Sequence, residues 1–445
     1  MRARFAIMDI VRDVAAEAGF HPVGTPALEY LSVLLGQGGE ETDKQVYRFK
    51  DHGGRDVGLR FDLTVPFARF VAEHQAELAF PFKRVQIGDV WRGENTQKGR
   101  YREFCQCDLD IIGVNSMSSD IEILLCIHRI LTKVNFGSFT IKVGNRPLLS
   151  SLIRATMPNL SHEKETSALI ALDKLEKIGE KEVLNLLVTL VSSSTQDAQI
   201  PHETCLKGPQ RLLDLLKAKT SSNESDLDAV INAFSHDQEA LAEAERLKTT
   251  LLVLKNLTKD SPGKFALDIS IARGLGYYNG IVYETTIDEL PGFGSISSGG
   301  RYNDLASRFM SRQLPGVGGS VGLDRLIAGL EELEESKGPG GSQLIPKTVS
   351  NMVFVAVATH DSIPYAFTIA QKLRAAGIKV DIGLTEGKLG HHFKHADRLG
   401  CRLVITVGTS EKESSSYSLK HMKTGTEEKS LPLSSIIEKV KDSLD

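Results

Sequence analysis

The stretch 82–113 constrains the fold of this chain most, because two long strand-like arms flank a polar loop at 93–100. Successive side chains of a strand point to opposite faces, so the second arm has two distinct faces. One carries Arg102, Phe104, Gln106, Asp108 and Asp110, and the other carries Cys105, Cys107, Leu109 and Ile111. Burying the polar face is costly unless its groups find partners. The pattern predicts a long hairpin with one polar face.

Part of the same hairpin is strongly basic within a chain that is not. From Lys83 to Arg102, six basic side chains against two acidic ones give a local charge of +4: Lys83, Arg84, Arg92, Lys98, Arg100 and Arg102 against Asp89 and Glu94. The whole chain of 445 residues carries −4, so its average charge does not indicate nucleic-acid binding. Guanidinium groups on the hairpin favour phosphate or carboxylate oxygens. A solvated hairpin with ordinary ion pairs accounts for the residues about equally well.

A second polar stretch, 59–70, alternates Asp62 and Thr64 with apolar side chains. The alternation predicts a strand that presents the Asp62 carboxylate to a cationic group. An aspartate that caps the following turn explains the same residues.

A third stretch, 267–284, places Arg273 at the end of a strand, before a glycine turn and the pair Tyr277-Tyr278. Glycines let the backbone approach a ligand, and tyrosines offer a ring and a hydroxyl. Considered alone, a tight turn with packing tyrosines is the favoured interpretation.

A glycine-rich region at 294–330 leads into a predicted helix that begins with the run G-L-D-R at 322–325. Arg325 is badly placed for the helix dipole unless an anion lies there. The spacing matches neither a P-loop nor a dinucleotide fingerprint.

The remaining chain predicts several ordinary units. A helix opens the chain and ends near Gly19, and another begins with Asp120 as its N-cap. Residues 147–260 predict a mostly helical insertion, and the Gly/Pro/Ser-rich stretch 336–347 predicts a linker. Alternating strands and helices over 348–445 predict an α/β domain with a largely parallel sheet.

The cysteines and the hydropathy of the chain indicate its cellular compartment. The five cysteines are few, odd in number and scattered, which favours a reducing compartment and predicts a cytoplasmic protein. Cys105 and Cys107 have no matching pair, so inward packing is favoured over a metal site. No apolar run is long enough to predict a membrane span.

Together these stretches resemble the signature motifs of class II aminoacyl-tRNA synthetases, and specifically the histidyl-tRNA synthetase family. Thr25-Pro26 resembles motif 1, the dimer-interface element; the hairpin with G-R-Y-R-E-F (99–104) resembles motif 2; and G-L-D-R (322–325) resembles motif 3. The stretch 59–69 and R-G-L-G-Y-Y (273–278) are similar to stretches characteristic of the family. The former is closest to its eukaryotic and archaeal form. Gly276 replaces the family's usual aspartate, and His391-His392 its commoner Lys-Gln.

The resemblance implies an α+β fold, with an antiparallel catalytic sheet of six to seven strands flanked by helices. The catalytic domain would comprise 1–146 and 261–335, interrupted by the insertion at 147–260. An anticodon-binding α/β domain would follow the linker at 348–445. The implied reaction activates L-histidine with ATP to histidyl-adenylate, releases pyrophosphate, and transfers histidine to the 3′ end of tRNA(His), releasing AMP.

The resemblance also implies roles for particular residues. Arg92 would hold the α-phosphate of ATP, Arg325 the γ-phosphate, and Arg273 the α-phosphate from the opposite side. Glu94 and Arg102 would complete the ATP site, with Mg²⁺ accompanying ATP and no metal ligand predicted among the side chains. The histidine site is expected to comprise Asp62, Thr64 and Gln106 for the ammonium, Asp110 and Tyr278 for the two imidazole nitrogens, and Tyr277.

The implied partners are tRNA and a second copy of the chain. Residues 372–402 hold seven basic side chains against three acidic, which alone favours a solvated helix face. With the resemblance, tRNA contacts are expected at Lys388, Lys394 and Arg398. Motif 1 implies a homodimer.

Two other functions remain open. One is a non-catalytic regulatory paralogue on the same fold, against which Arg92, Arg273 and Arg325 argue. The other is a nucleic-acid-binding or scaffold protein, which leaves Gln106 and Asp110 unexplained.

Overall fold

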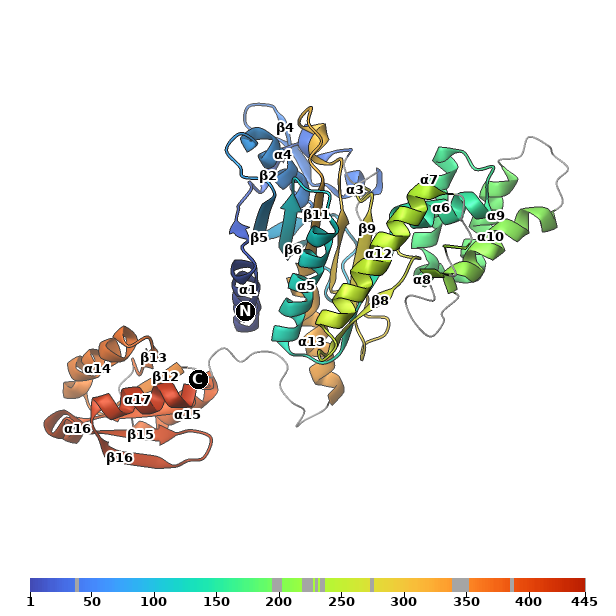
Figure 1. The fold of residues 1–445 in the computed structure, drawn as a ribbon. Helices are drawn as coiled ribbons and strands as arrows, with labels where there is room; N and C mark the ends of the chain where they lie inside the picture. The colour runs from blue at the N-terminus through green and yellow to red at the C-terminus, as the bar shows by residue number, and fades with distance from the viewer. Residues whose placement is uncertain are drawn as a thin grey trace. The chain divides into compact units, whose positions relative to one another are not determined.

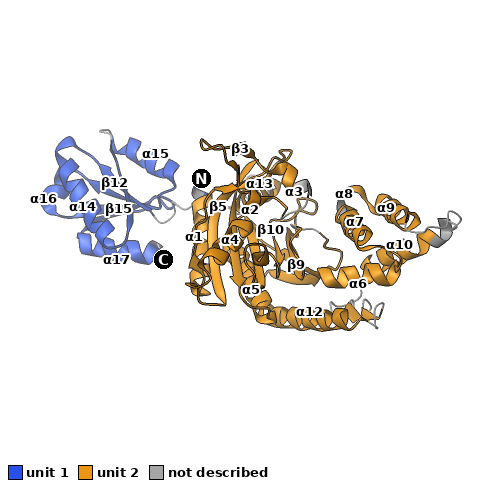
Figure 2. Cartoon of the chain, turned by 90° about the horizontal axis from the view of Figure 1, so that it is seen from above, with its two compact units in different colours: residues 1–3, 346–445 blue, residues 4–345 orange. Residues whose placement is uncertain are grey.

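The computed structural model describes residues 1–36, 40–193, 202–217, 227–228, 231–232, 237–272, 276–337, 352–384 and 388–444. The chain forms two compact units (Figure 2). One comprises residues 4–345, and the other comprises residues 346–445 together with 1–3. From residue 338 onward, the predicted linker at 336–347 lies outside the described residues.

The larger unit is built on one sheet, which in the described residues has eight strands in the order β1-β5-β6-β11-β10-β9-β7-β8. These are β1 (His21–Pro22), β5 (Phe82–Trp91), β6 (Glu103–Ile112), β7 (Phe139–Asn145), β8 (Gly263–Leu267), β9 (Ile281–Ile287), β10 (Ser297–Arg301) and β11 (Gly316–Gly322). The arms of the hairpin are β5 and β6, which pair antiparallel from Phe82 opposite Ile112 to Trp91 opposite Glu103. The predicted hairpin is confirmed.

The expected antiparallel sheet of six to seven strands is wrong, because the sheet is mixed and has eight described strands. β1 joins β5 in parallel at one edge, and β8 joins β7 in parallel at the other. β1 is only two residues long, too short for a periodic pattern to reveal it. β8 reaches its parallel partner only after a long helical crossover, which the order of elements along the chain does not disclose.

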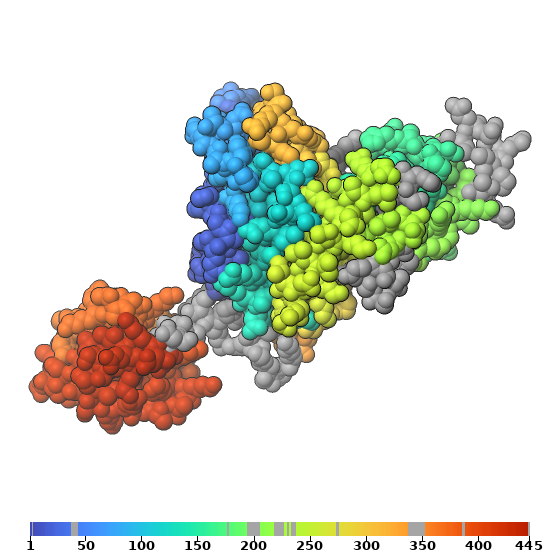
Figure 3. Space-filling model, in the orientation of Figure 1, coloured from blue at the N-terminus to red at the C-terminus, as the bar shows by residue number. Residues whose placement is uncertain are grey.

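Long helices cover one face of this sheet (Figures 1 and 3). They are α1 (Arg2–Glu17), α5 (Met117–Val134) and α12 (Gln238–Leu257), with α12 packed beside α5. The predicted apolar stripe of α5, which includes Ile123, Ile127 and Leu131, is fully buried in the same core as Cys105 and Cys107. Inward packing of these two cysteines is therefore confirmed.

The start of α5 differs from the prediction. Its N-cap is Ser116, whose hydroxyl oxygen accepts a hydrogen bond from the backbone N–H of Ser118 at 3.2 Å. Asp120 lies in the first turn and is buried instead of capping it. A serine and an aspartate are both good caps, so the sequence pattern alone does not choose between them.

Shorter elements lie over the other face. They are the three-stranded sheet β2 (Leu28–Tyr30), β4 (Asp56–Leu59) and β3 (Arg48–Lys50), the helices α2 (Leu31–Leu34), α3 (Glu40–Gln45) and α4 (Thr64–His74), and the 3-10 turn η1 (Ala306–Arg308). A second apolar core joins α4 to this face through Phe61, Phe67, Tyr302 and Leu305.

The strand predicted at 59–70 is wrong, because β4 ends at Leu59 and α4 begins at Thr64. Pro66 is tolerated in the first turn of a helix. The Oδ1 atom of Asp62 accepts a hydrogen bond from the backbone N–H of Val65 at 3.0 Å. The alternative in which Asp62 caps the following turn is the one observed.

Between β7 and β8 the described elements are all helices: α6 (Arg146–Thr156), α7 (His162–Asp173), α8 (Leu175–Ile178), α9 (Glu180–Ser192), α10 (His202–Lys217) and α12. Together these elements are called the helical module. After β11, the helix α13 (Leu323–Lys337) closes the larger unit.

The smaller unit holds a sheet in the order β13-β12-β14-β15-β16. Its elements are β12 (Met352–Val357), η2 (His360–Ser362), α14 (Ile363–Ala375), β13 (Lys379–Ile382), α15 (Leu389–Leu399), β14 (Leu403–Val407), α16 (Thr409–Ser414), β15 (Tyr417–His421), β16 (Glu427–Leu431) and α17 (Leu433–Leu444). The predicted alternation is confirmed for β12, β13 and β14, which are parallel. β15 and β16 continue the sheet antiparallel, which the prediction missed.

Across the described helices of both units, none combines the length and the apolar character that a membrane span requires.

The core behind the sheet should dominate the stability of the larger unit. Leu131 is fully buried, whereas Leu252 on α12 is 47% exposed. Replacing Leu131 by alanine should lower the free energy of unfolding by roughly 2–5 kcal/mol through lost burial and the cavity left behind. The fluorescence of Trp91, the chain's one tryptophan, reports urea unfolding of this unit. Leu252→Ala should cost far less, and equal losses would contradict this account of the core.

Candidate active site

The polar face of β6 is buried in the larger unit. Gln106, Asp108 and Asp110 retain exposures of only 9%, 3% and 1%. Such groups need partners or a ligand, because an unpaired buried polar atom is costly. Gln106 Oε1, Asp108 Oδ1 and Asp110 Oδ2 have no hydrogen-bond partner in the described part of the chain.

Asp110 lies between a tyrosine and an arginine. Its Oδ1 atom accepts a hydrogen bond from the Tyr302 hydroxyl at 2.5 Å, and its Oδ2 atom is 3.4 Å from Nη1 of Arg84. The Arg84 side chain is completely buried, and its Nη2 atom donates to the carbonyl oxygen of Leu63 at 2.6 Å. The guanidinium also lies 4.4 Å from the ring centre of Phe67, a cation–π distance.

Gln106 and Asp108 are joined through the neighbouring strand. The Gln106 amide donates to the Ser320 hydroxyl oxygen at 2.9 Å, and Ser320 also hydrogen-bonds to Asp108. Burial raises the pKa of Asp108 to about 7 and the nearby Asp110 adds to the shift, although Arg84 opposes it. The site therefore holds a carboxyl group that gains and loses its proton near neutrality.

Asp62 and the tyrosine pair complete this cluster. The Tyr277 hydroxyl donates to Asp62 Oδ2 at 2.8 Å, and the same hydroxyl hydrogen-bonds to Thr64. Burial raises the pKa of Asp62. Tyr278 packs edge-on against Tyr277, with ring centres 4.9 Å apart. The structure thus brings together five of the six predicted histidine-binding residues around β6 and α4. The sixth, Tyr278, lies beside them.

The predicted phosphate-binding arginines lie around the hairpin loop. Arg92 Nε donates to the carbonyl oxygen of Phe61 at 2.9 Å, and Arg92 Nη1 is 3.9 Å from Glu94. Arg325 Nη1 donates to the carbonyl oxygen of Lys98 at 2.8 Å, and burial lowers the pKa of Arg325. A guanidinium has five N–H donors, so one carbonyl contact leaves capacity for an anion.

The other predicted residues are less engaged. The side chain of Arg102 is exposed. Arg273 lies outside the described residues. Lys388, Lys394 and Arg398 are exposed at or along α15 in the smaller unit.

The sequence indicated that Asp108 lies on the polar face and that Arg84 is one of the basic side chains of the hairpin, but it gave neither residue a partner, and it assigned no role to Ser320 and Tyr302. A signal existed for Arg84, because the pairing of the hairpin arms places it opposite Asp110. Ser320 lies on β11 and Tyr302 directly follows β10, and neither carried such a signal.

The arrangement can bind a small polar cation beside an anion. Asp62, Asp108 and Asp110 offer three buried carboxyl groups, and the buried guanidinium groups of Arg84 and Arg60 lie near them. The unmatched oxygens of Asp108 and Asp110 suit a ligand rich in N–H donors. Arginines at the hairpin loop suit phosphates.

A mixed sheet with this polar face, joined in one chain to a separate α/β unit, defines a class II aminoacyl-tRNA synthetase. A family model of histidyl-tRNA synthetases matches residues 1–326, and a model of the anticodon binding domain matches residues 352–443. The chain therefore belongs to the histidyl-tRNA synthetase family.

Relatives and solved structures agree. A histidine–tRNA ligase of Rhodopirellula baltica is 41% identical over 95% of this chain and 90% of its own length, and one of Wolinella succinogenes is 39% identical over 95% and 91%. The crystal structure of a Nostoc histidyl-tRNA synthetase matches with a TM-score of 0.82 at 30% identity, covering 99% of this chain and 95% of that one. The expected closeness to the eukaryotic and archaeal form is not supported, because these relatives are bacterial. That expectation rested on the single stretch 59–69, which is too short to place a chain within a family.

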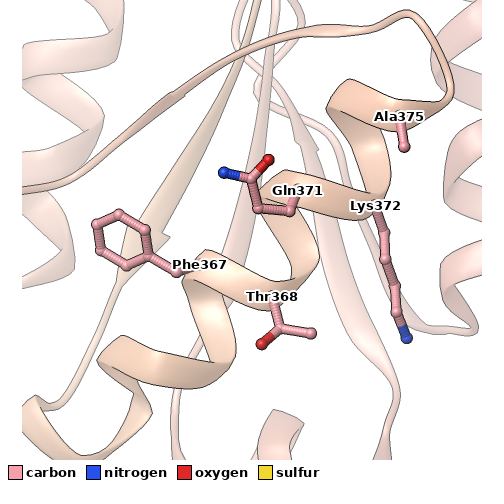
Figure 4. Close-up of a pocket in the computed structure, with 5 residues that line it drawn as sticks. All are labelled: Phe367, Thr368, Gln371, Lys372 and Ala375. Carbon is pink, nitrogen blue, oxygen red and sulfur yellow. The ribbon is translucent and has the colours of Figure 1, made fainter.

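A separate shallow hollow of about 560 Å³ lies in the smaller unit along α14 (Figure 4). Its described lining is Phe367, Thr368, Gln371, Lys372 and Ala375. One cation and no carboxylate line it in this part of the chain, so it does not share the chemistry of the β6 cluster.

The close approach of β11 to Asp110 gives a direct test of the cluster. A Cβ atom added at Gly318 would lie 2.0 Å from Asp110 Oδ1, so Gly318→Ala must displace the carboxylate. We expect the KM for histidine in ATP–pyrophosphate exchange to rise at least about tenfold, since a charged hydrogen bond is lost. Gly24→Ala, where a Cβ would meet nothing within 4 Å, is the control and should leave KM unchanged.

Asp108 should make stability depend on pH. The pKa of an aspartate in the unfolded chain is about 4, whereas burial raises the pKa of Asp108 in the folded chain to about 7. Between these values only the folded chain holds the proton, so the free energy of unfolding falls as pH rises from about 4 to about 7. Asp108→Asn removes this pH-dependent loss of stability. The free energy of unfolding of the variant minus that of wild type should therefore increase from pH 5 to pH 8. Urea unfolding at both pH values measures the change. The exposed Asp13→Asn should show none, and a pH-independent effect of Asp108→Asn would contradict the assignment.

Proposed function

We propose that the polar face of β6 binds L-histidine and that the arginines at the hairpin loop bind ATP. The chain is an aminoacyl-tRNA synthetase whose family activity is the ATP-dependent ligation of histidine to tRNA. The observation that carries the proposal is the set of buried, unmatched acceptor atoms on Gln106, Asp108 and Asp110. Histidine brings an ammonium and two ring nitrogens that match such acceptors.

In this proposal each part of histidine meets a different element. Asp62, Thr64 and Gln106 bind the ammonium, and Gln106 Oε1 is an acceptor without a hydrogen-bond partner in the described residues. Asp110 and Tyr278 bracket the imidazole nitrogens, with Tyr277 beside them. An amino acid that lacks either ring nitrogen would leave a buried group unpaired, at a cost of roughly 1–3 kcal/mol each.

The chemistry then needs positioning and charge neutralisation. The carboxylate oxygen of histidine attacks the α-phosphorus of ATP, the bond to the bridging oxygen breaks, and pyrophosphate leaves with its electrons. The adenylate then passes histidine to the terminal adenosine of tRNA, and AMP leaves. We propose that Arg92 and Arg273 stabilise charge at the α-phosphate and Arg325 at the γ-phosphate, with Glu94 and Arg102 supporting ATP.

Mg²⁺ is proposed to bind with ATP, because this ion is usually held by phosphates and water with one or two carboxylates. Within the described residues no group of three or more His, Cys, Asp or Glu side chains could hold a metal ion. The carboxylate of Glu94 is 3.9 Å from Nη1 of Arg92 and therefore lies beside the proposed phosphate site.

The smaller unit is proposed to contact the tRNA anticodon. Its match to an anticodon binding domain supports this role. Lys394 and Arg398 lie four residues apart on one side of α15, Lys388 directly precedes that helix, and all three are exposed. Such cations contact the nucleic-acid backbone and set position more than sequence. The domain limits 1–146, 147–260, 261–335 and 348–445 remain part of this proposal.

A homodimer through the motif 1 region is also proposed. Thr25 is buried and receives hydrogen bonds from Gln86 at 3.1 Å and, at its carbonyl, from Arg60 at 2.6 Å. Nearby elements expose large apolar side chains, Phe5 at 55% and Leu28 at 43%, which suit a protein interface. The buried free cysteines fit the proposed cytoplasmic location.

A regulatory paralogue is the second candidate, since a regulatory-subunit-like structure of Bacillus halodurans shares the fold with a TM-score of 0.67 at 19% identity. That likeness concerns the fold alone. The buried acceptors of β6 and the arginines beside the hairpin loop favour the enzyme.

One exchange experiment tests both candidates. Wild type should exchange pyrophosphate into ATP with histidine alone, and absence of exchange with all twenty amino acids would overturn catalysis. Arg325→Met should raise the KM for ATP or lower kcat/KM for ATP by about 10²–10³, as loss of one preorganised charge contact does. The KM for histidine should change little. Exposed Arg312→Met is the control, and an equal rise in both KM values would remove Arg325 from the phosphate site.

A further inference from the structure

A buried charge cluster lies behind the sheet, on the side opposite the proposed histidine site. Asp120 on α5 accepts hydrogen bonds from Arg301 at the end of β10, with Nε at 3.0 Å, and from Arg246 on α12 at 2.7 Å. The side chains of Asp120 and Arg301 are only 2% and 3% exposed. One carboxylate therefore holds two guanidinium groups from different parts of the chain.

Several contacts besides the ion pair with Asp120 hold the Arg301 side chain in place. Besides Asp120, its guanidinium donates to the Ser119 hydroxyl at 2.9 Å and to the carbonyl oxygens of Ser116 at 3.1 Å and Val114 at 3.3 Å. Charge-assisted bonds of this kind are directional and strong in a buried setting. The position of the backbone at the end of β10 is therefore set by α5 and the turn before it.

The same backbone supports the histidine site on the other side of the sheet. The next residue, Tyr302, donates its hydroxyl to Asp110. The carbonyl oxygen of Arg301 accepts a hydrogen bond from the backbone N–H of Asn279 at 2.9 Å, and the N–H of Asn303 donates to the Asn279 side chain at 3.0 Å. Residues 301–303 thus hold both Tyr302 and the segment that carries the tyrosine pair.

The base of the helical module makes a second connection to that segment. Arg146, at the start of α6, donates from Nη1 to the carbonyl oxygen of Tyr278 at 2.9 Å. Its backbone N–H donates to the carbonyl oxygen of Gly280, also at 2.9 Å. Asn145 donates to Glu243 on α12 at 2.8 Å. The two helices by which the module joins the sheet are therefore tied to each other and to the tyrosine segment.

We propose that the Arg246–Asp120–Arg301 cluster is a positioning element for histidine recognition, through which α12 of the helical module sets the place of Tyr302 against Asp110. The proposal rests on the histidine site proposed above. None of the three residues touches that site directly; they act through the backbone of 301–303. The helical module is thereby coupled to the affinity for histidine.

Arg246 is the residue to change, because its removal leaves the neutral Asp120–Arg301 pair intact. Removing Asp120 would leave two cations without an anion in a buried place, and a folding failure would follow. Lys248, two residues further along α12, pairs instead with Asp228 at 2.8 Å. Lys248→Met is therefore the matched control for Arg246→Met, because it lies on the same helix, removes the same charge and introduces the same side chain.

The experiment measures both substrate constants in histidine-dependent ATP–pyrophosphate exchange. Arg246→Met should raise the KM for histidine about three- to tenfold, in line with the net value of one partly exposed hydrogen bond, and should leave the KM for ATP unchanged. Lys248→Met should change neither. Arg246→Lys, which keeps the charge, should restore part of the affinity, and it replaces Arg246→Met if the latter does not fold.

A double-mutant cycle separates positioning from general stability. In a Tyr302→Phe background, which lacks the hydroxyl that Asp110 binds, Arg246→Met should have little further effect on the histidine KM. Additive effects would overturn the coupling through Tyr302, and so would an unchanged histidine KM in folded Arg246→Met. If Tyr302→Phe itself leaves the histidine KM unchanged, the proposed histidine site fails and the positioning role fails with it.

Discussion

The antiparallel pairing of β5 with β6 supports the rest of the larger unit, because it sets Arg84 directly opposite Asp110. Three buried carboxyl groups on one side of the sheet would repel one another and resist desolvation. Arg84 offsets part of that charge, and its guanidinium donates to the carbonyl oxygen of Leu63 and lies over the ring of Phe67. A guanidinium without a water-exposed atom is stable only in such surroundings.

The two faces of the sheet are chemically different but mechanically connected. Behind it, α1, α5 and α12 bury an apolar core that also contains the Asp120 cluster. In front, polar groups from β6, α4 and the tyrosine segment meet around Asp110. Adjacent side chains of an extended backbone point to opposite sides, so Arg301, the last residue of β10, and Tyr302, which follows it, serve one face each. This alternation lets a contact behind the sheet affect a ligand in front of it.

Sequence patterns predicted the elements whose structure depends on near neighbours in the chain, and they failed to predict the edge strands of the large sheet. The hairpin arms, the stripe of α5 and the first alternating elements of the smaller unit were predictable, because periods of 2 and 3.6 act over short distances. β1 is too short to show a period, and the parallel pairing of β8 depends on a distant strand. Alternation at 59–70 predicted a strand, but packing of Phe61 and Phe67 in the front core favours the turn into α4.

The alternation of residues along the chain is enough to place Gln106, Asp108 and Asp110 on one face of a strand, and the same sequence puts arginines beside the loop that precedes this strand. The contacts of these groups follow from the folded structure alone, because their partners come from remote parts of the chain. Tyr302 is 192 residues from Asp110, and Ser320 is 214 from Gln106. The raised pKa of Asp108 also follows from burial by the assembled sheet. Local periodicity specifies which way a side chain points, whereas dehydration and charge pairing arise only once distant strands have packed together.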